Sequence, residues 1–198
     1  DKWNVPDGFE ILPVVSGLHL PVNMAFHPNP GPNDTDPYMY ITLLYGEIVM
    51  VQRNFETQTY ASDLLNFDPN GEFPGSGELG VIGVTVDPTS GDVFASMVYD
   101  SLGEKWGKIT RFASTDGGRT AATQTDIFTQ IPSAYSHQVH NLSIGPDDML
   151  YVNVGDGFVS TAAPDVNDLR GKVLRMHKDG SLPNDNPFED TYIYAKAF

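Results

Sequence analysis

The sequence predicts an all-β protein, a partial β-propeller, from three observations. Short segments that alternate apolar and polar residues recur along the chain, as strands packed between neighbouring sheets do. The turn prolines Pro28, Pro88 and Pro146 recur at intervals of 60 and 58 residues. The composition, with 19 Gly, 15 Pro and only 19% charged residues, is that of a turn-rich β protein. A long repeat of several short strands is typical of propeller blades.

Each repeat has the same order of elements. The first covers residues 22–51, where VNMAF precedes the turn and YMYITLLYGEIVMV follows it. The second runs over residues 81–100 as VIGVTVDPTSGDVFASMVYD and continues into GKITRF at residues 107–112. The third begins at Val139 as VHNLSIGPDDMLYVNVGDG and continues into GKVLRM at residues 171–176. We therefore expect a strand, a proline turn, a second strand, a loop and a third strand in every blade.

The number of repeats limits the architecture. The 198 residues hold about three such units, whereas a propeller closes with about four to eight blades. No linker or shift in composition divides the chain, so we expect residues 1–198 to form a single, incomplete propeller domain. An open arc would expose a blade face and strand edges. We therefore expect the C-terminal half of the ring to be a partner, on the same chain or on a second one.

Charge and composition narrow the classes of partner. The formal net charge of −15 disfavours nucleic acid and anionic lipid, and is compatible with calcium or with a neutral sugar. The chain has no cysteine, which excludes disulfides and thiolate sites. No apolar run has the length of a membrane span. The first residue is Asp, for which cleavage of a secretory signal is one explanation, and we expect a periplasmic or secreted protein.

Two histidines mark the start of the third repeat. His137 and His140 precede or open its first strand, where side chains can reach the mouth of a propeller channel. An imidazole at that place can accept a proton near neutral pH. Taken alone, such a pair is more often structural than catalytic. A zinc site that uses both is disfavoured, because residues three apart on a strand point to opposite faces.

The same region carries a resemblance to a known family. The dipeptide His137-Gln138, the segments IGPDDMLYVNVGDG and LRGKVLRMHKDGSLPNDNPF, and the final IYAKAF resemble the soluble glucose/sorbosone dehydrogenase family. The segment GSGELGVIGVTVDP, at residues 75–88, is similar to that family's Glu/Gln-Gly-Gly-Leu-Leu-Gly-x-x-x-x-Pro motif. The resemblance implies a propeller of about six blades that uses pyrroloquinoline quinone (PQQ) to oxidise sugars, and this chain matches its N-terminal half.

The resemblance also implies roles for particular residues. His137 matches the catalytic base, which takes the proton of the sugar C1 hydroxyl while hydride passes to the quinone. Glu78 matches a Gln or Glu beside the cofactor. Gln138 adjoins the base, and Asp156 and Gly157 belong to the turn that lines the cofactor. We expect these three residues, together with Glu78 and His137, to contact PQQ. No metal ligand is assigned to this chain.

The resemblance implies that further functional residues lie beyond Phe198. They are an Arg-Asn pair, further basic contacts to PQQ, and the ligands of the activating Ca²⁺. We therefore expect these 198 residues to be inactive alone, and the electron acceptor is unknown. Two other functions stay open. One is a Ca²⁺-dependent propeller lactonase or other hydrolase, in which water replaces the quinone. The other is a non-catalytic binding propeller that has lost the cofactor; Ser136 and Gly157, which differ from the residues of some family members, leave room for it.

Overall fold

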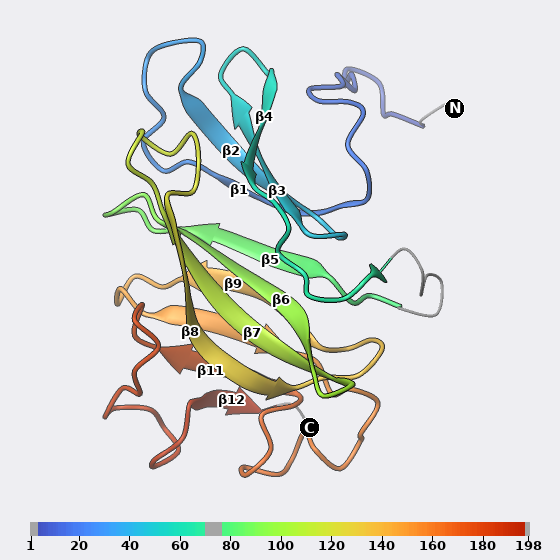
Figure 1. Cartoon of the computed structure of the whole chain (residues 1–198), viewed down its shortest axis with the longest axis vertical. Helices are drawn as coiled ribbons and strands as arrows, with labels where there is room; N and C mark the ends of the chain where they lie inside the picture. The colour runs from blue at the N-terminus through green and yellow to red at the C-terminus, as the bar shows by residue number, and fades with distance from the viewer. Residues whose placement is uncertain (1–3, 70–76, 197–198) are drawn as a thin grey trace.

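The computed structural model describes residues 4–69 and 77–196, which form twelve strands in three sheets (Figure 1). Gly75 and Ser76 of the motif segment lie outside these residues. The strands of the first sheet are β1 (Pro21–Phe26), β2 (Pro37–Leu43), β3 (Glu47–Gln52) and β4 (Thr57–Ala61). Those of the second are β5 (Val81–Val86), β6 (Val93–Ser101), β7 (Glu104–Ala113) and β8 (Thr123–Pro132). Those of the third are β9 (Val139–Ile144), β10 (Leu150–Val154), β11 (Lys172–Met176) and β12 (Ile193–Lys196).

Each sheet is an antiparallel meander whose strands pair in chain order. Figure 1 shows the three sheets one beside the next, from the blue first sheet to the red end of the third. This arrangement confirms the prediction of an all-β chain of three propeller blades. Each blade has a fourth, outer strand in addition to the three that its repeat predicts.

The first strands of the blades lie together at the inner side of the arc. β5 packs between β1 and β9, and the amide of Asn23 on β1 donates to Asn141 Oδ1 on β9 at 2.9 Å. Gly83 on β5 occupies the equivalent position, and a Cβ there would overlap the carbonyl oxygen of His140. A glycine on the middle blade is thus what allows three inner strands to approach this closely.

Apolar cores fill the two spaces between adjacent blades. One core joins the first and second blades around Tyr40, Met50 and Phe112, all fully buried. The other joins the second and third blades around Phe94 and Leu174. Burial of each such side chain contributes about 1.5–3 kcal/mol, so the middle blade is held on both faces.

Several loops lie together at one end of the arc because of the directions in which the strands run. The beginnings of β5 and β9, the β6–β7 hairpin and the loop between β10 and β11 all lie at this end, because neighbouring strands run antiparallel. Within the described residues, no helix is long and apolar enough to cross a lipid bilayer. The candidate site is built from these loops.

Candidate functional site

His137 lies in the loop that leads into β9 and has a left-handed backbone with φ of 58°. This conformation is uncommon for a residue other than glycine and is found preferentially at functional sites. The backbone N–H of His137 donates to Glu78 Oε2 at 3.2 Å. Glu78 reaches this position from the segment before β5, so two blades together fix the direction in which the imidazole projects.

The imidazole of His137 pairs with a carboxylate from the β10–β11 loop. His137 Nδ1 lies 2.7 Å from Asp156 Oδ1. The hydrogen bond from His137, together with one from the backbone N–H of Phe158, holds the pKa of the Asp156 carboxyl below its usual range. An ionised carboxylate can only accept hydrogen bonds, so Nδ1 carries a proton, and in the neutral imidazole Nε2 then keeps its lone pair. The arrangement prepares His137 to act as a base through Nε2.

An aromatic ring covers the imidazole. The ring centroids of His137 and Phe158 are 4.1 Å apart, with an interplanar angle of 30°. Phe158 has φ of 60°, also left-handed, and its side chain is 66% exposed. A bulky exposed residue in this conformation is unusual, and here it places an apolar face against the ring of the candidate base while its N–H bonds Asp156 Oδ1 at 3.1 Å.

Two glycines let the β10–β11 loop approach His137. The N–H of Gly157 donates to the carbonyl oxygen of His137 at 2.9 Å, and the N–H of Gly155 donates to that of Gln138, also at 2.9 Å. A Cβ on Gly155 would overlap the backbone of His137, and Gly157 has φ of 58°. A glycine at position 155 is therefore required for the backbone of the turn to lie against the base-bearing loop, and glycine at 157 suits the left-handed backbone there.

Glu78 and Gln138 tie the second blade to the third. The side-chain amide of Gln138 donates to the carbonyl oxygen of Glu78 at 2.7 Å, and the N–H of Glu78 donates to that of Tyr135 at 3.0 Å. Gln138 is 3% exposed, and its Oε1 is buried with no hydrogen-bond partner among the described residues. The structure gives Gln138 a role in holding the loop, and its contact with a cofactor stays a prediction.

The candidate base is open to solvent. The side chains of His137 and Asp156 are 50% and 39% exposed. His140 lies within β9, where its carbonyl oxygen accepts a hydrogen bond from Ser96, and its ring is exposed without reaching the His137–Asp156 pair. A substrate hydroxyl could thus approach His137 directly. His140 does not belong to the His137–Asp156 pair.

A pocket of about 570 Å³ adjoins Asp156. Lys172 and Lys196 line it, and the ammonium of Lys172 already donates to the carbonyl oxygens of Ala162 and Arg170 at 2.8 and 2.7 Å. Burial lowers the pKa of Lys172. Among residues 4–69 and 77–196, no group of three or more His, Cys, Asp or Glu side chains could hold a metal ion.

The structure brings all five predicted site residues to one place. Glu78, His137, Gln138, Asp156 and Gly157 are joined by the hydrogen bonds given above. The sequence did not reveal that Asp156 bonds the candidate base. Nor did it point to Phe158, because an aromatic residue after a glycine turn has no pattern that would mark it.

Comparison with known proteins identifies a family and several related structures. The sequence pattern of the family described as Glucose / Sorbosone dehydrogenase matches residues 18–197. Quinoprotein glucose dehydrogenase B from Acinetobacter calcoaceticus is 32% identical over 98 residues, which are 40% of this chain and 20% of that protein.

Solved structures share the fold. An oxidoreductase described as a glucose dehydrogenase, from Thermus thermophilus, is 27% identical, with a TM-score of 0.71 over 88% of this chain and 48% of its own. The PQQ-bound aldose sugar dehydrogenase of Streptomyces coelicolor is 24% identical, with a TM-score of 0.72 over 91% of this chain and 51% of its own. This chain therefore spans about half the length of the structures that it matches.

Proposed function

Because this chain belongs to the glucose/sorbosone dehydrogenase family, we propose that it supplies the general base of a PQQ-dependent aldose dehydrogenase. The observation that carries the proposal is the His137–Asp156 pair, 2.7 Å apart and half exposed at the loop end of the blades. The same chemistry is supported by the family's sequence pattern, which matches residues 18–197, and by the quinoprotein relative. Because the chain spans about half the length of the solved structures that it matches, the activity is proposed for a protein with a complete ring.

The residues of this chain would act on the sugar hydroxyl. His137 Nε2 takes the proton of the C1 hydroxyl, while Asp156 holds the proton on Nδ1 and stabilises the imidazolium that forms. Phe158 covers one face of the imidazole and limits its rotation. PQQ, when bound, supplies the acceptor for the hydride that leaves C1.

The residues present fit part of what the quinone requires. PQQ carries carboxylates, and Lys172 and Lys196 are among the residues that line the pocket beside Asp156. The Oε1 of Gln138, buried and without a hydrogen-bond partner in the part of the chain that the structure describes, is an acceptor on the base-bearing loop. We assign no calcium ligand to the described residues, and the remaining cationic contacts are expected from the other half of the ring.

The proposal is tested by titrating the intact protein with PQQ in the presence of Ca²⁺ and following aldose-dependent reduction of a dye. We expect saturable activity that requires PQQ. A folded protein that binds no PQQ and reduces no dye would contradict the proposal. Lactone hydrolysis with Ca²⁺ alone would instead support the hydrolase, for which the described residues bring together no metal-binding cluster of carboxylates.

Asp156→Asn is expected to lower kcat by about a hundredfold. The amide can donate a hydrogen bond to Nδ1, which favours the tautomer with the proton on Nε2 and removes the lone pair that the reaction needs. The measurement is steady-state kcat with saturating PQQ, compared with Asp165→Asn, a carboxylate outside the pair. An Asp156→Asn rate equal to that of the control would exclude the orienting role.

A further inference from the structure

The connection between β10 and β11 is a long loop that closes on itself. It spans residues 155–171, and the N–H of Gly171 donates to the carbonyl oxygen of Gly155 at 2.9 Å, so its two ends meet. Ala162 and Ala163 are buried inside it, with exposed fractions of 2% and 7%. A surface loop of this length, with its ends together and its own side chains packed within, is an Ω-loop, a class that is frequently functional. We call residues 156–170 the Ω-loop.

Lys172, the first residue of β11, places a buried ammonium against the Ω-loop. The residue is 3% exposed, and Nζ donates to the carbonyl oxygens of Ala162 and Arg170 at 2.8 and 2.7 Å. Burial lowers the pKa of Lys172, while the carboxylates of Asp168 and Asp165 in the same loop act in the opposite direction. A buried charge is costly unless it is hydrogen-bonded, so the ammonium and the two carbonyl groups hold one another in place.

The bond from Lys172 to Ala162 is connected to Asp156 through two successive turns. The N–H of Ala162 donates to the carbonyl oxygen of Val159, and the N–H of Val159 donates to that of Asp156, both at 2.9 Å. These short hydrogen-bonded turns leave the backbone between the three residues little freedom. The position of Ala162 therefore limits the position of Asp156.

The bond from Lys172 to Arg170 is connected to the same carboxylate through a side chain. The Arg170 guanidinium is fixed by Asp168, with Nη2 2.6 Å from Oδ2. Its stem lies beside Gly157, where a Cβ would come within 3.2 Å of Arg170 Cδ. Gly157 directly follows Asp156. Loss of the bond to the Arg170 carbonyl would therefore loosen the Ω-loop where it packs on the Gly-Asp-Gly turn.

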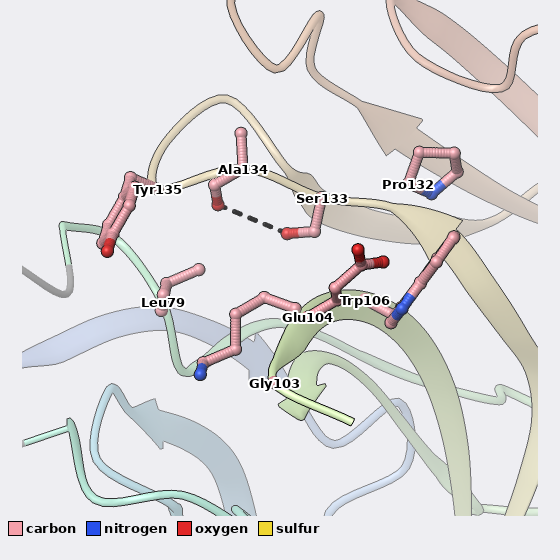
Figure 2. Close-up of a pocket in the computed structure, with 9 residues that line it drawn as sticks. Leu79, Gly103, Glu104, Trp106, Pro132, Ser133, Ala134 and Tyr135 are labelled. Atoms are coloured by element: carbon pink, nitrogen blue, oxygen red, sulfur yellow. Dashed lines mark hydrogen bonds between the residues drawn. The ribbon is translucent and has the colours of Figure 1, made fainter. Parts of the chain in front are cut away.

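The loop that carries His137 takes part of its support from the Ω-loop. Asp156 lies 2.7 Å from His137 Nδ1, and Phe158 stacks on the imidazole. The base-bearing loop also borders an open pocket of about 700 Å³ on the second blade, and Figure 2 shows Ala134 and Tyr135 at its edge. Tyr135 is 64% exposed there. The direction of the imidazole thus depends on the Ω-loop, together with the bonds to the second blade described above.

We propose that Lys172 is a positioning residue for His137. Its buried ammonium holds the Ω-loop in the conformation that brings the Asp156 carboxylate to Nδ1 of the imidazole, and so keeps the lone pair of Nε2 free for the substrate proton. The inference rests on the proposed function for the reaction that His137 performs, and on the loop contacts alone for the position of Asp156.

Lys172→Met, which removes the N–H donors and keeps an unbranched stem, tests this role in the intact protein loaded with PQQ and Ca²⁺. We expect kcat to fall by about ten- to a hundredfold, as for a small displacement of a catalytic group, and KM for the aldose to change by less than about threefold. Lys172→Met combined with Asp156→Asn should lose no more than Asp156→Asn alone, because the lysine acts through the carboxylate that the second change removes. Losses that multiply would overturn the proposal.

The tautomer of His137 gives a readout that does not require turnover. ¹⁵N NMR of the imidazole nitrogens, in intact protein without PQQ and at a pH where the ring is neutral, distinguishes the nitrogen that carries the proton from the one that keeps its lone pair. The spectrum of His137→Ala assigns the signals. We expect the proton on Nδ1 in the wild type and a mixture of both tautomers in Lys172→Met. An unchanged His137 spectrum in Lys172→Met would overturn the positioning role.

Lys178→Met is the matched control. Lys178 follows the opposite end of β11 and pairs with Asp87 at 2.8 Å and Asp148 at 2.7 Å. Its loss should lower the free energy of unfolding while kcat and the His137 tautomer stay as in the wild type. Equal effects of the two lysine variants on the tautomer would show a general disturbance of the third blade and overturn the proposal.

Lys172→Gln takes the place of Lys172→Met if the latter does not fold. It keeps N–H donors without the charge, and we expect changes in kcat and tautomer in the same direction. If no aldose is oxidised but the tautomer responds to Lys172, the dehydrogenase proposal fails and the positioning role is supported. If aldose is oxidised and neither kcat nor the tautomer responds, the positioning role fails and the dehydrogenase stands.

Discussion

His137→Ala in the intact protein is expected to lower kcat by about 10²- to 10⁴-fold, the usual contribution of a general base. The imidazole is the candidate proton acceptor whose Nδ1 is held by a carboxylate at 2.7 Å. The affinity for PQQ should change by less than about tenfold, because the change removes a catalytic group rather than the pocket. Single-turnover kinetics and a PQQ titration measure the two quantities separately.

His140→Ala is the matched control for this variant. It removes an exposed histidine from β9, three residues further along the chain and outside the His137–Asp156 pair. We expect its kcat to stay within about twofold of wild type, as for a surface substitution. Near-normal turnover in His137→Ala would remove that residue from the mechanism, and equal losses in both variants would point to a general disturbance of β9.

Gly155→Ala is expected to lose both activity and stability. The added methyl group would overlap the carbonyl oxygen, the carbonyl carbon and the Cα of His137, all of them backbone atoms that no rotamer change can move aside. Overpacking of this kind costs about 1–3 kcal/mol. A displacement of the base by about 1 Å is worth about a hundredfold in rate. Urea unfolding and kcat under saturating PQQ are the measurements.

Gly145→Ala serves as the comparison. Gly145 lies in the turn at the other end of β10, where a methyl group would meet the side chains of Asp147 and Tyr151 rather than backbone. We expect activity to be retained there, with a smaller loss of stability. If Gly155→Ala keeps full activity, the close approach of the Gly-Asp-Gly turn to His137 is not needed for function.

The sequence predicted the three blades because their central strands are apolar and alternate regularly. The outer strands of the first two blades, β4 and β8, were missed for the opposite reason. β4 and β8 carry mostly polar residues, and each has only one buried residue, so their apolar periodicity is too weak to mark a strand. Their place is set by pairing with β3 and β7, which depends on tertiary structure.

The resemblance named candidate site residues but not the contacts among them. The resemblance pointed to His137, Glu78 and Asp156, whereas the bonds among them join segments 59 and 19 residues apart. Those bonds depend on the left-handed backbone of His137 and on the close approach of Gly155. A single sequence shows neither feature, and the stacking of Phe158 on His137 follows only from the folded arrangement.

The most direct test of the central claim is a single turnover without oxygen or dye. PQQ-loaded intact protein is mixed with excess aldose that carries either hydrogen or deuterium at C1, and the absorbance of the bound quinone is followed. We predict that the quinone is reduced in a sugar-dependent step, more slowly with the deuterated sugar and far more slowly in His137→Ala. Stoichiometrically bound PQQ that no aldose reduces, in wild-type protein, would contradict the assignment of this chain to a sugar dehydrogenase site.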